Sequence, residues 1–412
     1  MPGRSLPGRL AALSTIAALV TLSGCTASSA IKTTPSPTRS ATPATSPSAS
    51  ASASGMPSPS VSPSPTPPGI DPDFVPALAS IQMVGPRLGW AVGAYAIFAT
   101  NDGTHWAKQL ASTEQFVGVD FITASTGWVV GVRTLLGTTD GGKTWQTLGE
   151  APKPIRSVHF ISASEGWGIA GGGNPQMNHG WLLPGYAGTL VKTDDGGHTW
   201  ANLDSPVDPD SVCFSDAAHG WLATAAGQVY SSPDGGHSWS KVLETLLEQA
   251  GAGGQQIIVE CAAPSALWLQ TTLPGAALSH RPYVVYATQD GHSWRTVMRE
   301  SYTTGSLLPG VPPGPDSYPG SFSVVDPADA VFVGDGPATM VGQCVVASDG
   351  GATLRRTGSI ANASETFGAA FVSLTTGWVL TRIIDGDYVI EATNDGGYHW
   401  SPQLAIAPSS AG

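Results

Sequence analysis

Apolar positions along this chain come in short runs, and each run is followed by the same kind of turn. Thr189-Leu190-Val191 precedes an Asp-Gly-Gly turn, and Gln228-Val229-Tyr230 precedes another. In such a turn the Asp carboxylate accepts backbone N–H groups, and glycine supplies a positive φ without a Cβ clash. Short apolar runs on either side of these turns predict β-hairpins.

The turn is a repeat signature. It is clearest at Thr138-Thr-Asp-Gly-Gly-Lys-Thr-Trp145 and returns six more times, although the copy at 347–354 has lost its Trp. A large indole directly after each turn predicts an apolar plug between neighbouring sheets. The turn aspartates are interpreted as structural bend-formers, and they are Asp102, Asp140, Asp195, Asp234, Asp290, Asp349 and Asp395.

A second motif alternates with the first. Phe121 is followed six residues later by Gly127-Trp128, and the unit recurs from Phe160, Phe214 and Phe371, with three weaker copies elsewhere. Twelve of the 13 tryptophans fall in the two motifs, and Trp181 alone stands outside them. The aromatic content is therefore committed to a repeated structural unit.

Seven units of this size predict an all-β fold, a seven-bladed β-propeller of four-stranded antiparallel blades. The shortest spacings between turn aspartates, from Asp102 to Asp140 and from Asp195 to Asp234, match one blade. The chain ends shortly after Trp400, so we expect each blade to be contiguous in sequence, with no strand exchanged at ring closure.

The Asp turns resemble the Asp-box (BNR) repeats of sialidases and related propellers. Their pairing with Phe…Gly-Trp units is similar to the photosystem II stability and assembly factor family, of the Ycf/Hcf type. The resemblance spans about residues 81–400. It implies a propeller that acts as a scaffold for membrane-protein partners, and its matching residues are structural.

The N-terminal part predicts export and anchoring. Residues 1–24 carry Arg4, Arg9 and a short apolar run, as in a secretory signal, and they end before Cys25 in a sequence that resembles a lipoprotein lipobox. Lipidation of Cys25 would anchor the protein to the outer face of the cell membrane; the alternative is an ordinary signal peptide. Residues 25–70 are rich in Ser, Thr, Pro and Ala and predict a disordered tether, so the propeller is expected at 71–412.

Composition excludes some partners. The formal net charge is −12 and no basic cluster occurs, so the chain does not have the basic footprint of a nucleic-acid-binding protein. Gly171-Gly-Gly173 is not accompanied by the lysine and helix of a phosphate loop, and we expect no cofactor.

Cysteine positions suggest one disulfide. Cys213 precedes the Phe position of the fourth repeat, whereas Cys261 occupies the Phe position of the fifth, so their side chains point to opposite faces of adjacent blades. We predict a Cys213–Cys261 disulfide; the alternative is two buried free thiols. Cys344 is expected to be buried and free.

Long insertions predict a functional face. They occur at 171–188, 243–254, 271–282 and 301–320, and strand direction places all four on the face opposite the Asp turns. The residues that we predict for partner or ligand binding lie in these insertions or directly beside them, and they are His179, Trp181, Tyr186, His280, Arg281, Tyr283, Tyr302, Asp316 and Tyr318. Trp181 has the alternative role of closing its own loop.

The central channel offers a second set. Asp120, His159 and Glu260 share one column of the predicted inner strands and are candidates to bind a cation or polar ligand, with structural solvation of the channel as the alternative. The Arg motif near the start of sialidases has no match, because Arg87 follows Pro86. The sequence thus predicts a protein-binding or assembly scaffold, with glycan binding or hydrolysis as the alternative.

Overall fold

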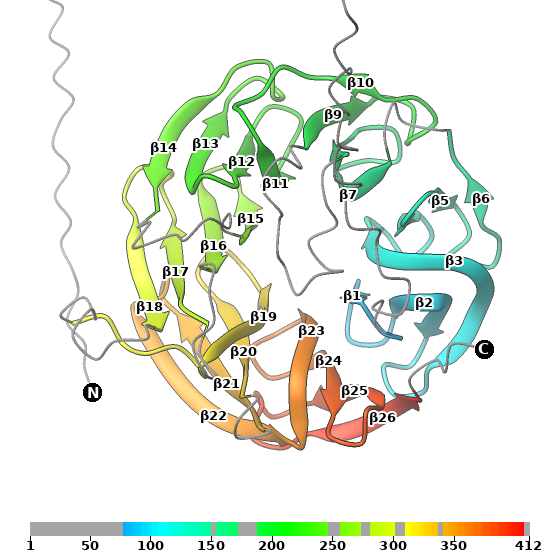
Figure 1. Ribbon diagram of the computed structural model, residues 1–412, viewed down its shortest axis with the longest axis vertical. Helices are drawn as coiled ribbons and strands as arrows, with labels where there is room; N and C mark the ends of the chain where they lie inside the picture. The colour runs from blue at the N-terminus through cyan, green and yellow to red at the C-terminus, as the bar shows by residue number, and fades with distance from the viewer. Residues whose placement is uncertain are drawn as a thin grey trace, which may run out of the picture. The chain divides into compact units, whose positions relative to one another are not determined.

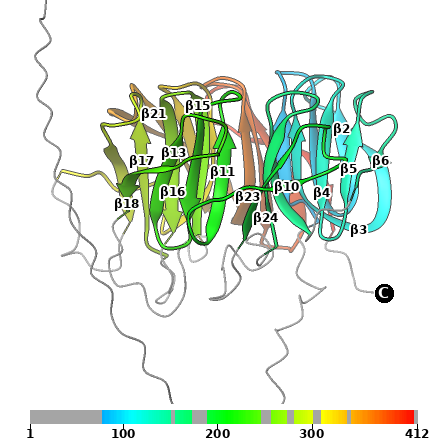
Figure 2. The same cartoon turned by 90° about the horizontal axis from the view of Figure 1, so that it is seen from above.

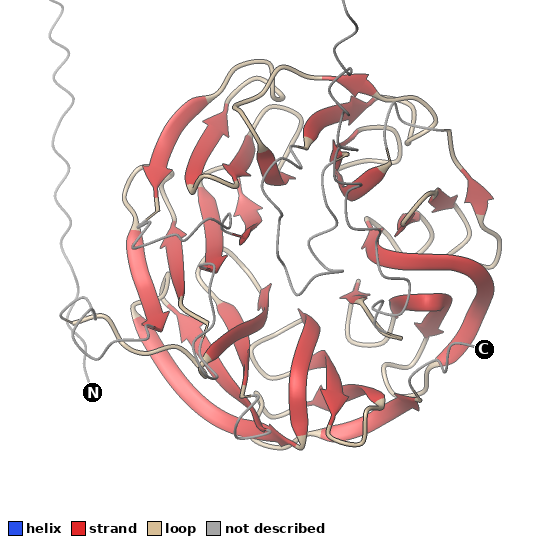
Figure 3. Ribbon diagram, in the orientation of Figure 1, coloured by secondary structure: helices blue, strands red, loops and turns tan. Residues whose placement is uncertain are grey.

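The computed structural model describes residues 77–149, 154–171, 188–245, 256–272, 281–300, 310–336 and 341–407. Figure 3 shows strands and loops throughout this part of the chain. Within it, no helix has the length and apolar character needed to cross a membrane. Cys25, the signal sequence and the tether lie outside the described residues.

The strands form six sheets arranged as a ring (Figure 1). The first sheet has six strands, β1 (Ser80–Met83), β2 (Gly89–Thr100), β3 (Ala107–Phe121), β4 (Gly127–Gly131), β5 (Leu135–Thr138) and β6 (Gln146–Thr147). The fold is therefore the predicted all-β propeller of antiparallel strands.

Each of the five remaining sheets has four strands and is contiguous in sequence. They are β7 (Ile155–Phe160), β8 (Gly166–Ala170), β9 (Thr189–Thr193) and β10 (Ala201–Asn202); β11 (Pro209–Phe214), β12 (Gly220–Thr224), β13 (Gln228–Ser232) and β14 (Ser240–Glu244); β15 (Gln256–Ala263), β16 (Ala266–Thr272), β17 (Tyr283–Thr288) and β18 (Arg295–Glu300); β19 (Tyr318–Val324), β20 (Ala330–Asp335), β21 (Val341–Ser348) and β22 (Thr353–Ala361); and β23 (Ala363–Phe371), β24 (Gly377–Ile383), β25 (Tyr388–Thr393) and β26 (Ser401–Ile406).

The prediction of seven separate blades was wrong, because six sheets accommodate the seven repeats. β3 pairs with β2 through Ala107–Gln115 and with β4 through Phe116–Phe121, so one strand joins the first two repeats into a single sheet. β3 curves from the outer rim toward the centre of the ring (Figure 1). No proline interrupts β3, whereas Pro206 and Asn362, with a φ of 62°, break the chain at two later connections.

The ring closes by side-chain packing. Leu78 and Ile81 from the start of the propeller share a core with Trp378 and Leu380 of the last sheet. The Trp378 indole Nε1 donates to the Gly103 carbonyl oxygen at 3.1 Å. Each sheet consists of consecutive strands, which confirms the prediction of contiguous blades.

The Phe…Gly-Trp motif builds the contacts between sheets. Trp128 of β4 stacks on Phe160 of β7, with ring centroids 3.5 Å apart, and Trp200 meets the same ring edge-on at 6.0 Å. A Cβ on Gly166 would lie 2.4 Å from the Phe160 ring, so this position requires glycine. The plug between sheets is thus the Trp of the Gly-Trp pair, with the Trp after the Asp turn supporting it.

The Asp turns are bends held by their carboxylates. Asp140 Oδ1 accepts the Thr144 backbone N–H at 2.9 Å, and Oδ2 accepts the Thr144 hydroxyl at 2.7 Å. These hydrogen bonds lower the pKa of Asp140 to about 2. The same bonding lowers the pKa of Asp102, Asp195, Asp234, Asp290 and Asp395.

Asp349 belongs to the turn that has lost its Trp, and it differs. It adopts a φ of 56° itself, and its Oδ2 accepts the Thr353 hydroxyl at 3.1 Å.

Candidate functional site

The inner-strand column predicted to line the channel joins neighbouring sheets. Asp120 Oδ2 accepts the Phe160 backbone N–H at 2.7 Å, and His159 Nε2 lies 2.7 Å from the Phe214 carbonyl oxygen. Glu260 Oε2 accepts the Val324 N–H at 3.0 Å. Each side chain therefore contacts the next inner strand, which favours the structural interpretation for Asp120 and His159.

Cys213 occupies the same column and forms a disulfide with Cys261 of the next sheet, with their Cα atoms 5.9 Å apart. Like these hydrogen bonds, the disulfide links two neighbouring inner strands, β11 and β15. Cys261 occupies the position that other repeats give to Phe. Cys344 is a buried free cysteine, and burial raises the pKa of its thiol to about 11.

A cavity of about 320 Å³ lies at one end of the channel. It is lined by the beginnings of the inner strands β1, β15, β19 and β23 and by the ends of β16 and β20. The strands run between the two faces of the ring (Figure 2). The residues with charged or amide side chains in its wall are Gln256, Glu260, Gln270, Arg281, Asp335 and Glu365.

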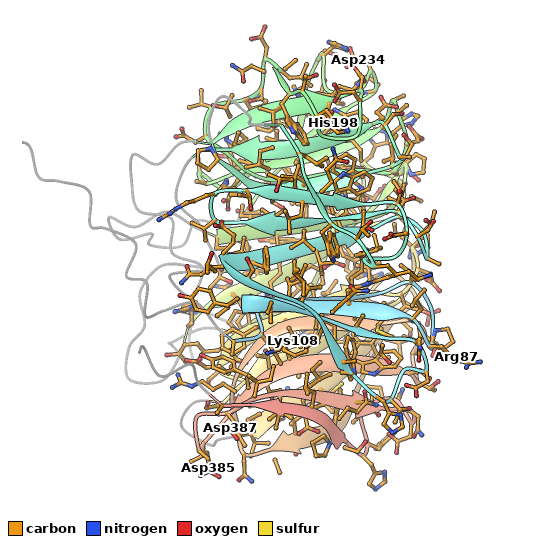
Figure 4. All side chains as sticks on the ribbon, turned by 90° about the vertical axis from the view of Figure 1, so that its right-hand side faces the viewer. Arg87, Lys108, His198, Asp234, Asp385 and Asp387 are labelled. Carbon is orange, nitrogen blue, oxygen red and sulfur yellow. A yellow bond between two sulfur atoms is a disulfide. The ribbon has the colours of Figure 1, made fainter. Side chains whose placement is uncertain are left out.

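The cavity lies at the face opposite the Asp turns. Asp385 and Asp387, in the turn between β24 and β25, lie at one face of the propeller, and Arg87, in the turn between β1 and β2, lies at the other (Figure 4). Inner strands begin, and second strands end, at the face of Asp385. This is the face for which the sequence predicted the insertions.

Two carboxyl groups in the cavity have raised pKa values. Glu260 and Asp335 are half-buried, because part of each faces the cavity while protein surrounds the rest. Desolvation raises the pKa of Glu260 to about 7, although the hydrogen bond from the Val324 N–H acts in the opposite direction and lowers it. Desolvation also raises the pKa of Asp335 to about 7, and the opposing effects of hydrogen bonds from Thr366 and of the Arg281 charge do not cancel it.

Arg281 and Tyr318 are brought together at the cavity. The Arg281 guanidinium lies 5.3 Å from the centroid of the Tyr318 ring, within the range of a cation–π contact. Tyr318 is also the register partner of Asp335 across β19 and β20. A cation, an aromatic ring and a carboxyl group are thus adjacent on the cavity wall.

The segment before β19 is fixed to its surroundings. The buried Tyr283 hydroxyl donates to the Asp316 carbonyl oxygen at 2.9 Å, and Asp316 Oδ1 accepts the Ser317 N–H at 2.7 Å. Arg356 donates to the Pro315 carbonyl oxygen at 3.1 Å. Tyr283 and Asp316 therefore support the segment that positions Tyr318, and neither lines the cavity.

Of the residues predicted from the insertions, Arg281 and Tyr318 line the cavity. His179, Trp181, Tyr186, His280 and Tyr302 lie outside the described residues. Gln270, Asp335, Glu365 and Gln256 were not predicted from the sequence. The first two had a signal, since each is a polar residue in the last part of an otherwise apolar second strand.

No protein-family profile matches this chain, and no curated protein matches it either. Solved structures do. YCF48 from Cyanidioschyzon merolae is 16% identical with a TM-score of 0.50, over 81% of this chain and 96% of that chain. An oligogalacturonate lyase in complex with manganese is 10% identical with a TM-score of 0.50, over 79% and 92%.

An ancestral GH74 enzyme is 14% identical with a TM-score of 0.52, over 81% of this chain and 47% of that chain. The chain thus spans about half the length of that enzyme. At these identities the similarities show the fold. The fold is a β-propeller similar to that of YCF48, in agreement with the resemblance found in the repeats.

Proposed function

We propose that this protein is a lipid-anchored, extracytoplasmic propeller that binds a segment of a partner polypeptide in the cavity and acts as a scaffold for it. The observation that carries the proposal is that residues in or next to three separate insertions line one cavity. Gln256 follows one predicted insertion, Thr272 and Arg281 lie within a second, and Tyr318 lies within a third; all four residues line the same cavity.

The strands around the cavity suit a polypeptide. β1, β15, β19 and β23 are each the first strand of their sheet, so each has one edge that is not paired with another strand. Side chains of neighbouring sheets bond some N–H groups along these edges, as Glu260 does with Val324 on β19. An extended peptide can hydrogen-bond to such edges while its side chains enter a pocket. The similarity to YCF48 supports the propeller fold on which the proposed scaffold is built.

Crosslinking tests the proposal. A photo-reactive phenylalanine analogue replaces Tyr318 in the full chain, and the matched control carries it at Tyr398, which is 48% exposed in the Asp turn at the opposite face. We expect position 318 to crosslink a specific membrane protein in the native cell, and position 398 to give none. Identical products from both positions, or none from 318, would contradict the proposal.

Anchoring is tested separately. The proposal rests on the lipobox-like sequence before Cys25. In the C25S variant we expect loss of fatty-acid labelling and release of the protein from the membrane fraction. Retention of the label would show that another residue carries the lipid.

A second candidate function is glycan binding or hydrolysis. It is favoured by the presence of Glu260 and Asp335, both with pKa values of about 7, in one cavity, because a general acid must be protonated at neutral pH. Hydrolysis of a panel of aryl glycosides, abolished in Asp335→Asn, would establish this function in place of the scaffold.

A further inference from the structure

The cavity contains acceptor atoms that the surrounding protein does not satisfy. Gln270 is 2% exposed; its Nε2 donates to the Gly320 carbonyl oxygen at 3.2 Å, whereas no described residue donates a hydrogen bond to its Oε1. Asp335 Oδ1 is a second buried acceptor without a partner among the described residues. Unsatisfied buried acceptors are costly, so both atoms favour a ligand that brings N–H donors.

The cavity is also acidic. Among the described residues, Glu260, Asp335 and Glu365 line it together with one guanidinium, that of Arg281. Arg382 does not line the cavity but pairs with Glu365 at 3.8 Å, so three carboxyl groups, when all are ionised, exceed the two guanidinium groups by one charge. A ligand with one positive charge balances this excess.

We propose that the cavity binds the ammonium group of a lysine side chain on the partner polypeptide. The inference rests on the proposed function and names the residue that the partner inserts. The acceptors belong to Gln270 on β16, Asp335 on β20 and Glu260 on β15, so they come from three strands. An ammonium group has three donors that point in different directions, whereas a guanidinium requires acceptors near one plane.

The remaining wall suits the aliphatic part of lysine. Ile81, Ile258 and Phe322 line the same cavity, and a lysine stem packs on apolar surface while its ammonium reaches polar atoms. A volume of about 320 Å³ is at the small end of ligand pockets, which range from about 300 to 1,000 Å³. The cavity therefore accommodates one long side chain.

Titration of the full chain with model compounds tests the inference. The probes are N-acetyl-lysine methylamide, its norleucine counterpart and its arginine counterpart, with dissociation constants measured by NMR at pH 8. We expect the lysine compound to bind about tenfold more tightly than the norleucine compound. Equal affinities, or tightest binding of the norleucine or arginine compound, would overturn the inference.

Variants locate the site. We expect Asp335→Asn and Gln270→Met each to weaken binding of the lysine compound about fivefold to tenfold, with the norleucine compound unaffected. The control Asp385→Asn removes the same charge from an exposed turn at the same face and should change nothing. Thermal unfolding reports whether each variant is folded. Unchanged affinity in the folded cavity variants would exclude this site.

The pH dependence gives a further readout. The groups that face Asp335 are Arg281, Glu365 and Thr366, and the pKa of Asp335 is about 7. An ammonium ion prefers the ionised carboxylate, so affinity should rise from pH 6 to pH 8 and binding should release protons; a flat profile counts against the inference.

The two tests separate the claims. Lysine-selective binding without a crosslinked partner would remove the proposed function and keep the lysine site. A crosslinked partner without lysine selectivity would keep the proposed function and remove the lysine site.

Discussion

The first four repeats and the region from β15 to β22 solve the same packing problem in different ways. In the first region, Trp90 stacks on Phe121, Trp128 on Phe160 and Trp167 on Phe214, at centroid distances of 3.4, 3.5 and 3.8 Å. In the second, the Phe position holds Cys261 and then Val324. The Trp–Phe stack is absent there from the described residues, although Phe322 stacks on Phe332 at 5.3 Å within one sheet, and Cys261 forms a disulfide with Cys213 of the preceding sheet.

The cavity lies beside the second region. Glu260, Gln270 and Asp335 all belong to β15–β20. Regular aromatic packing fills the contacts between sheets, whereas the irregular repeats leave polar groups and space near the channel. In this protein the candidate site therefore lies beside the repeats that depart most from the Phe…Gly-Trp motif.

The largest expected effect is in the regular region. Trp128→Ala removes a fully stacked indole and should lower the free energy of unfolding by about 3 to 5 kcal/mol. Trp294→Ala, at a half-buried tryptophan of the irregular region, should cost less. Urea denaturation of both variants measures the difference. Equal losses would break the comparison.

The disulfide should matter next. The double variant with Cys213→Ser and Cys261→Ser should lose about 2 to 4 kcal/mol, because the covalent link restricts the unfolded chain. A reducing agent should lower the melting temperature of the parent protein and leave that of the double variant unchanged. Sensitivity of the double variant to reduction would point to a different cause.

The cavity carboxyl groups predict an unusual pH dependence. The folded pKa values of Glu260 and Asp335 are raised to about 7, so the folded state binds more protons than the unfolded state between about pH 4 and pH 7. Their contribution to stability is present at low pH and lost as the pH rises toward 7. The turn aspartates act in the opposite direction, since their lowered pKa values make stability fall in acid.

We therefore expect Glu260→Gln and Asp335→Asn to raise stability at pH 8 by roughly 1 to 3 kcal/mol each, and to have little effect near pH 4. Melting temperatures across this pH range provide the measurement. Destabilisation of both variants at pH 8 would show that their carboxylates are satisfied in the folded state.

The smallest effect compares two indole N–H groups. Trp128 Nε1 donates to the Gly196 carbonyl oxygen at 2.9 Å, whereas the buried Trp221 Nε1 has no acceptor in the part of the chain that the structure describes. Trp128→Phe should therefore cost about 1 kcal/mol more than Trp221→Phe. Denaturant midpoints of the two variants decide this, and a reversed order would contradict the assigned hydrogen bond.

The repeats predicted most of the architecture because they encode local interactions. The Asp turn needs only its own carboxylate, hydroxyl neighbours and glycines, as Asp140 shows. The Phe…Gly-Trp motif likewise reports a close contact between two paired strands, since Phe160 and Gly166 are register partners. Local interactions did not determine the number of sheets, because this number depended on β3 continuing across the boundary between two repeats.

The site was predicted only in part. Arg281 and Tyr318 were found because they lie in or beside long insertions, where packing does not explain a polar or aromatic residue. Gln270 and Asp335 were missed because they lie within second strands and outside the insertions from which binding residues were predicted. Glu260 was predicted to line the channel together with Asp120 and His159. The sequence of its own strand could not show that Asp335 and Glu365 line the same cavity.

By itself the sequence determined the turns, the paired indoles, the order of the strands and the two cysteines that face each other between sheets, because periodic and short-range chemistry specifies these. Tertiary structure alone decided which polar side chains share a cavity. Glu260, Arg281, Asp335 and Glu365 come from separate strands and connections. Packing of three neighbouring sheets brings them together and withdraws them from water, which raises the pKa values of Glu260 and Asp335.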